Sequence, residues 1–164
     1  MDSHNLFMTR TTYRLVRLEY GAALGTAVVL AFMHLGEIRW LAFAGLFAYI
    51  DLIGYIPGAI AWRRAGGRME TRAYHVLYNL MHSFVSAGAV AGLWCLTVGP
   101  EWALLALPIH LCGDRALLGN FLKPFALSFE AQTHPAYQEF VTRYEQPDRV
   151  PAHDDGTRHP VAAA

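Results

Sequence analysis

Long apolar stretches of this chain carry side chains that could bind a metal ion or transfer protons. His110 and Asp114 are four residues apart and Asn79 and His82 are three apart, so each pair would share one helix face. Imidazole and carboxylate groups are common ligands of transition metals. A charged side chain at bilayer depth costs at least ~3 kcal/mol by insertion scales, so such residues usually serve a function. The sequence therefore predicts an intramembrane polar site, drawn from Glu19, Asp51, Asn79, His82, His110, Asp114 and Arg115.

The formal charges of this set do not balance. Glu19, Asp51 and Asp114 oppose one deep cation, Arg115, which leaves an excess of two negative charges when the histidines are neutral. Buried carboxylates without partners become protonated or acquire a cation. A divalent metal ion would supply that cation, and its predicted ligands are His82, His110 and Asp114, with a further carboxylate as the fourth. Two alternatives stay open: Arg115 pairs with one of the acids, or the acids are protonated.

The remaining members of the site are assigned by their spacing from these ligands. Asp51 or Glu19 is predicted to act as a base or as the fourth ligand, and Arg115 completes the predicted catalytic set. Tyr55 follows Asp51 by four residues and Tyr78 precedes His82 by four, so each shares a helix face with a site residue. The predicted cofactor-binding residues are Tyr55, Tyr78 and Asn79.

The elements that must position these groups are apolar and long. The chain is 54% hydrophobic and 16% charged, against ~25% charged residues in soluble domains. About 20 apolar residues are needed to cross a bilayer, and the segments that qualify are Tyr13–Leu35, Trp40–Trp62, Tyr74–Val98 and Trp102–Leu122. Backbone polar groups in lipid must be satisfied within each segment, and the short connections favour sequential antiparallel neighbours. The expected fold is an all-α, integral membrane four-helix bundle.

Basic residues distinguish the two membrane faces. The N-terminal arm, the second connection and the end of the fourth span are rich in Arg and Lys, whereas the first and third connections hold a single Arg between them. The positive-inside rule then places both termini in the cytoplasm. The expected layout is a polar arm over 1–12, the four-span domain over 13–123, a surface segment with a short helix over 124–146 and a disordered cytoplasmic tail over 147–164.

Several short motifs occur in an order that resembles a known family. They are Arg17-Leu18-Glu19, Asp51-Leu52 with Gly54-Tyr55, Tyr78-Asn79 with His82, His110 with Asp114-Arg115, Gly119 with Leu122-Lys123, and Phe129 with Thr133-His134. Over roughly 14–135 the chain resembles small bacterial four-span membrane proteins that are described only as a domain of unknown function. The chain departs from the family pattern after Asp114-Arg115, and its tail beyond Pro135 is extra. The resemblance implies a shared membrane fold and polar set in a bacterial cytoplasmic membrane, and no particular activity.

Three functions compete on these grounds. The first is a membrane-embedded metalloenzyme, an oxidoreductase in its leading form, that uses iron, copper or zinc on a lipid-soluble substrate. The second is a metal-free isomerase or cyclase of a terpenoid-like substrate, with Asp51 and Asp114 as acid and partner. The third is a non-enzymatic subunit that binds a pigment or quinone, or belongs to a larger membrane complex or homo-oligomer. The expected partners are the bilayer and a hydrophobic small molecule; zero net charge argues against nucleic acid.

Overall fold

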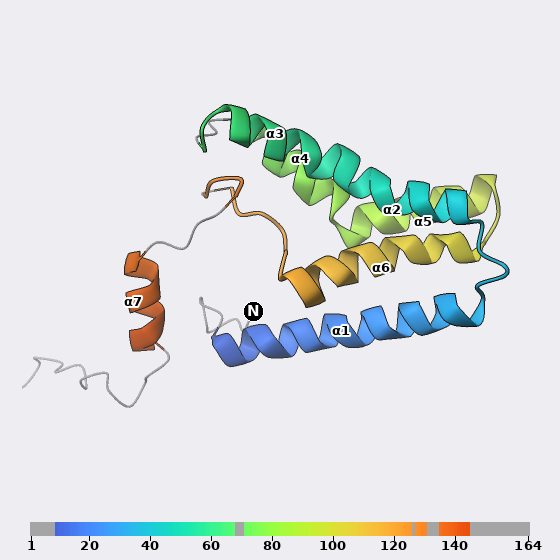
Figure 1. Cartoon of the computed structure of the whole chain (residues 1–164), viewed down its shortest axis with the longest axis horizontal. Coiled ribbons are helices and arrows are strands. Elements are labelled where there is room, and N and C mark those ends of the chain that lie inside the picture. Colours follow the sequence, from blue (N-terminus) through green and yellow to red (C-terminus); the bar gives the residue numbers. More distant parts are fainter. Residues whose placement is uncertain (1–8, 68–70, 126, 131–134, 145–164) are drawn as a thin grey trace, which may run out of the picture. The chain divides into compact units, whose positions relative to one another are not determined.

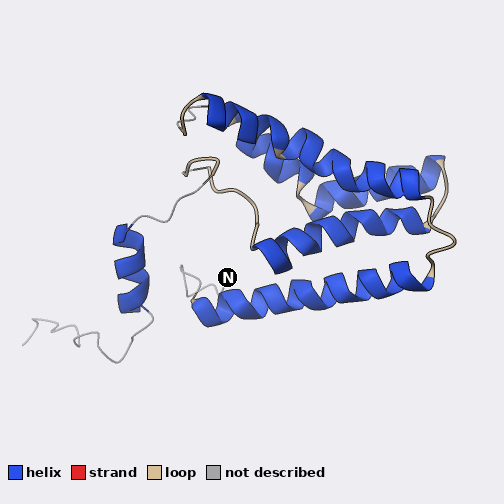
Figure 2. Cartoon of the chain, in the orientation of Figure 1, coloured by secondary structure: helices blue, strands red, loops and turns tan. Residues whose placement is uncertain are grey.

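A computed structural model describes residues 9–67, 71–125, 127–130 and 135–144. The chain divides into two units, 1–132 and 133–164, which are treated separately. Within the described part only helices and loops are present (Figure 2). This confirms the all-α prediction for these residues. The helices are α1 (Arg10–Met33), α2 (Trp40–Gly54), α3 (Ile56–Arg64), α4 (Ala73–Met81), α5 (Phe84–Thr97), η1 (Trp102–Leu105), α6 (Ala106–Gly113), η2 (Asp114–Leu118) and α7 (Pro135–Tyr144).

Two helical stretches of the first unit are long and apolar enough to cross a membrane. They are α1, with 24 residues, and the run Trp40–Arg64, with 25 residues, which joins α2 and α3. Tyr55 separates α2 from α3, and Pro57 lies in the first turn of α3. Proline lacks a backbone N–H and clashes with the preceding turn, which explains this interruption. Helix α1 starts at Arg10, inside the predicted polar arm, because the Thr9 side chain caps it by accepting a hydrogen bond from the Thr12 N–H.

The third predicted span is broken. It was expected as one helix over 74–98, but α4 and α5 are bent by 56° at His82 and Ser83. The Ser83 hydroxyl accepts a hydrogen bond from the Val85 N–H at 3.1 Å and so starts a new helix. The pair is apolar enough to count as one bent span. Because of this break, His82 lies at the C-terminal end of α4 and not inside a continuous helix.

The fourth predicted span is irregular and shorter than expected. It begins as the 3₁₀ turn η1, continues as α6 and ends as the π-helical turn η2. The helical structure ends at Leu118, not at Leu122, because Gly119 adopts a left-handed φ of 74°. Turns of the π type occur often at functional sites, and this one starts at Asp114.

Helix α6 lies between α1 and the α2/α5 layer (Figure 1). Its residues Ala106, Leu107 and Leu111 are buried in a core that α2 and α5 complete. The principal partner of α1 is α6 together with η2, rather than α2. The expected succession of sequential neighbours is therefore wrong for the first two segments. The fourth segment takes the central position, which buries its His110 and Arg115.

The loop that follows η2 returns to the ends of α3 and α4. Phe129 is buried to 1% exposure and packs on Ala59 and Tyr78. Its ring occupies the space that a side chain at Gly58 would need. The Asn79 amide holds the loop by donating to the Lys123 carbonyl at 2.9 Å and accepting from the Lys123 N–H at 2.7 Å. The loop therefore closes this end of the bundle.

The second unit contains α7, a short helix that lies inside the segment 124–146, where the sequence analysis expected one. Its Tyr137, Phe140 and Tyr144 rings pack in series, with centroids 6.5 and 5.7 Å apart. Arg143 and Glu139 form an ion pair at 2.6 Å on the same helix. The predicted tail over 147–164 lies outside the described residues.

Candidate metal centre

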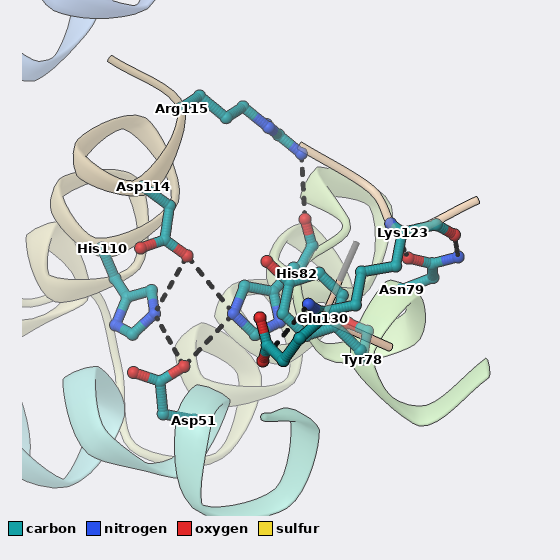
Figure 3. Close-up of polar contacts among 9 residues, drawn as sticks. All are labelled: Asp51, Tyr78, Asn79, His82, His110, Asp114, Arg115, Lys123 and Glu130. Carbon is teal, nitrogen blue, oxygen red and sulfur yellow. Dashed lines mark hydrogen bonds and ion pairs between the residues drawn. The ribbon is translucent and has the colours of Figure 1, made fainter. Parts of the chain in front are cut away.

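Four side chains meet at the break between α4 and α5. The Nε2 atom of His82 lies 3.3 Å from the Asp51 Oδ1 and 3.3 Å from the Asp114 Oδ2. The Nε2 atom of His110 lies 3.7 Å from the same two oxygens. Figure 3 shows the two imidazoles and the two carboxylates turned toward one point, from α2, the α4/α5 break, α6 and η2.

The backbone fixes which nitrogen of His82 is available. The Nδ1 atom of His82 is 3.0 Å from the Tyr78 carbonyl oxygen. A carbonyl can only accept, so Nδ1 carries a proton and donates it, and Nε2 is the nitrogen that faces the carboxylates. This is the arrangement of metal-binding histidines, whose second nitrogen usually donates to a carbonyl or carboxylate.

The distances between these atoms are compatible with a shared cation. Neither Nε2 makes a hydrogen bond with acceptable geometry, although both are buried. Around a tetrahedral ion with bonds of about 2.1 Å, neighbouring ligand atoms lie about 3.4 Å apart. The ligand atoms of Asp51, His82 and His110 all lie within 4.8 Å of one another. These three residues could therefore hold a metal ion. Asp114 lies beside both histidines but is not a member of this group.

The centre is enclosed except at one carboxylate. The side chains of His82, His110 and Asp114 are 5%, 3% and 15% exposed, whereas that of Asp51 is 43% exposed. Phe47, one turn before Asp51 on α2, packs on His110 with ring centroids 4.6 Å apart. Asp51 is therefore the most accessible side chain of the four.

Arg115 supports this centre without pairing with its acids. Its Nη2 donates to the His82 carbonyl at 2.9 Å, and its guanidinium lies 4.4 Å from the Phe84 ring and 5.0 Å from the Tyr20 ring. Within the described residues it forms no salt bridge, so the alternative in which Arg115 neutralises an acid is not what the structure contains. Instead, it satisfies a carbonyl left without a helical partner at the C-terminus of α4.

The other predicted site residues divide between the centre and its surroundings. Tyr78 stacks on His82 with ring centroids 3.8 Å apart, and Tyr55 meets Tyr78 edge to face at 6.4 Å. Asn79 faces Lys123, and its side-chain amide forms hydrogen bonds with the Lys123 backbone. Glu19 is exposed on α1, outside the group. Removing Glu19 from the interior leaves two acids against Arg115, a smaller excess than the sequence suggested.

Lys123, His75 and Phe129 pack near the centre, but the sequence analysis did not assign them to the site. The Lys123 ammonium lies 4.2 to 5.6 Å from the rings of Phe129, Tyr78 and Tyr55 and donates to the Phe129 carbonyl at 2.6 Å. Burial lowers the pKa of Lys123 below its usual value, and the nearby Glu130 only partly opposes this shift. His75 is 3% exposed, and its Nε2 lies 3.1 Å from the Leu127 carbonyl. Lys123 and Phe129 follow the last span, where no helical spacing relates them to the site.

Comparison with known proteins adds no relative. No model of a known protein family, no curated protein and no solved structure matches this chain. The geometry of the centre is therefore the basis on which a function can be inferred.

Proposed function

We propose that this chain is a membrane-embedded metalloenzyme whose centre is held by His82, His110, Asp51 and Asp114. The observation that carries the proposal is the convergence of two imidazole nitrogens and two carboxylate oxygens at 3.3 and 3.7 Å without hydrogen bonds between them. A divalent ion would offset the two carboxylates, which are costly to bury unpaired. Nitrogen and oxygen ligands suit zinc, iron or copper.

The substrate that fits this centre is lipid-soluble. The four residues lie on segments that are apolar, and the half-buried Asp51 is followed in sequence by Leu52 and Ile53, which are 59% and 45% exposed. In a bilayer these side chains would meet acyl chains, so a hydrophobic molecule would approach from the lipid. Bound metal would act as a Lewis acid or as a redox centre. Asp51, as the accessible carboxylate, would accept or donate the proton of the reaction.

The membrane topology belongs to the same proposal. Four crossings require the bent pair α4–α5 and the irregular run η1–α6–η2 to span the bilayer in addition to α1 and α2–α3. The distribution of Arg and Lys supports termini in the cytoplasm, in a bacterial cytoplasmic membrane if the resembled family is the true one. Membership of that four-span family remains our proposal, on the motifs that converge at the centre.

Metal analysis of the purified protein tests the function. Protein solubilised in detergent should contain close to one equivalent of a transition metal, and His82→Ala and His110→Ala should each lose it. His34→Ala is the matched control, because His34 is a partly exposed histidine bound to Glu37 at the other end of the chain's long helices. Sub-stoichiometric metal that is equal in all four proteins would refute the proposal.

A second candidate function rests on the same four groups without metal. His82 lies at 3.3 Å from two carboxylates, so it could pass a proton between Asp51 and Asp114 in an isomerase or cyclase. Activity on a terpenoid-like substrate that survives exhaustive chelation would favour this function over the first.

A further inference from the structure

A cavity of about 590 Å³ lies at the basic end of the second span, and none of the four side chains of the metal centre lines it. Its walls are formed by the end of α3, the turn after it and the loop that follows η2. The lining residues are Trp62, Arg63, Gly66, Gly67, Leu127, Ser128 and Glu130. Both glycines have positive φ, 62° and 82°, so a turn without side chains forms one wall.

The walls carry one charge of each sign. Within the described residues the exposed Arg63 makes no ion pair or side-chain hydrogen bond. Glu130 carries the charge opposite to that of Arg63. Its side chain is 36% exposed, and its buried Oε1 makes no hydrogen bond. The Lys123 ammonium is 3.8 Å from that oxygen but donates to the Phe129 carbonyl. The cavity therefore presents the Arg63 cation and the partly exposed Glu130, whose buried Oε1 forms an ion pair with Lys123.

The third feature of the cavity is a fixed aromatic ring. The Trp62 Nε1 donates to the Ser128 hydroxyl at 2.8 Å, which fixes the indole between α3 and the loop. Tryptophan near the end of a span lies at the level of lipid head groups. Its ring face also attracts ammonium groups.

From these features we propose that the cavity binds a phosphate ester that carries a primary ammonium group, as the head group of phosphatidylethanolamine does. Arg63 binds the phosphate, and Glu130 accepts hydrogen bonds from the ammonium beside Trp62. A zwitterion places a group of opposite charge against each of these two walls. A trimethylammonium group has no N–H to donate to Glu130, so phosphatidylcholine should bind more weakly. This site does not depend on the metal centre.

Native mass spectrometry of the full-length protein in detergent tests the proposal. Titration with dioleoyl phosphatidylethanolamine should give an apparent Kd at least ~5-fold lower than with dioleoyl phosphatidylcholine. Glu130→Gln should abolish this preference, and Arg63→Gln should weaken binding of both lipids. Arg64→Gln is the matched control, since Arg64 is the exposed neighbour that does not line the cavity. A cooperative thermal unfolding transition measured in parallel shows that each variant is folded.

Two further measurements complete the test. Displacement of the lipid by an equal concentration of soluble phosphoethanolamine would assign the same chemistry to a free phosphate ester, and its failure would assign it to the lipid. Glu130→Asp, which withdraws the carboxylate, should reduce the preference even if Glu130→Gln fails to fold. Equal affinity of the wild type for the two lipids, or a preference that Glu130→Gln retains, would overturn the proposal.

Discussion

At the scale of single residues, the centre depends on groups that orient its ligands. His82 is held from two sides, because its Nδ1 donates to the Tyr78 carbonyl and its own carbonyl accepts from Arg115. Tyr78 also stacks on the imidazole. Residues that hold ligands in this way are worth about 10- to 100-fold in metal affinity.

Arg115 should affect metal binding through His82. We expect Arg115→Gln to weaken Zn²⁺ binding about 10-fold, because the His82 carbonyl loses its donor and the imidazole loses its orientation. Competition titration with a chromogenic chelator measures the affinity. Arg17→Gln is the control, since Arg17 also donates to backbone carbonyls, those of Ala116 and Leu117, but touches no ligand. A larger loss of affinity in Arg17→Gln than in Arg115→Gln would contradict this role.

At the scale of elements, the centre requires close packing of α2 on the end of α4. A Cβ atom at Gly54 would lie 2.8 Å from the Met81 Cβ and 3.1 Å from the His82 Nδ1. Both distances are too short for an unshifted neighbour. The glycine in the Gly54-Tyr55 motif is therefore explained by the approach of two helices at the ligand.

Gly54→Ala should destabilise the protein and impair the centre. We expect a loss of about 1–3 kcal/mol in unfolding free energy from overpacking, together with weaker metal binding as His82 shifts. Gly45→Ala tests the same change on the same helix, where a Cβ would meet nothing within 4 Å. It should be neutral or stabilising by up to about 1 kcal/mol, as alanine favours helices. Chemical unfolding in detergent measures both, and equal effects would disprove the packing argument.

At the scale of the whole molecule, an ion pair joins the two loops opposite the basic end. Glu101 accepts hydrogen bonds from Arg39 and, at 2.6 Å, from the Trp94 Nε1. The hydrogen bonds from Arg39 hold the pKa of Glu101 below its usual range. This pair ties the start of α2 to the start of η1.

The pair makes stability depend on pH. A carboxyl whose folded pKa is lowered stabilises the protein above its unfolded pKa of about 4.3, and that stabilisation is lost as the pH falls through the folded value. Between about pH 6 and about pH 3 the wild type should therefore lose more stability than Glu101→Gln. Thermal unfolding in detergent measures the difference. Glu139→Gln, in the exposed pair on α7, should keep the wild-type slope; an identical slope in Glu101→Gln would exclude the pair as the cause.

Cysteine labelling decides the number of crossings. In a Cys95→Ser, Cys112→Ser background, we expect an impermeant maleimide to label Gly36→Cys and Pro100→Cys on intact cells. Arg64→Cys and Gln138→Cys should react only after lysis. Labelling of Gly36→Cys without Pro100→Cys would mean that the bent pair α4–α5 re-enters the membrane instead of crossing it. In that case only two crossings would stand.

The sequence by itself determined that this chain is helical and apolar and that its polar site is drawn from a small set of residues on the apolar segments. The set is Glu19, Asp51, Asn79, His82, His110, Asp114 and Arg115. Composition and helical period suffice for that, because lipid forces backbone groups into helices and makes buried charges costly. Only the tertiary structure decided which polar residues converge. In the tertiary structure Glu19 is exposed, and the Asn79 amide forms a hydrogen bond with the Lys123 backbone. The tertiary structure also turns Arg115 to a carbonyl rather than an acid. These outcomes depend on the break at His82, the π-helical turn at Asp114 and the returning loop, which arise from packing between distant segments and not from local spacing.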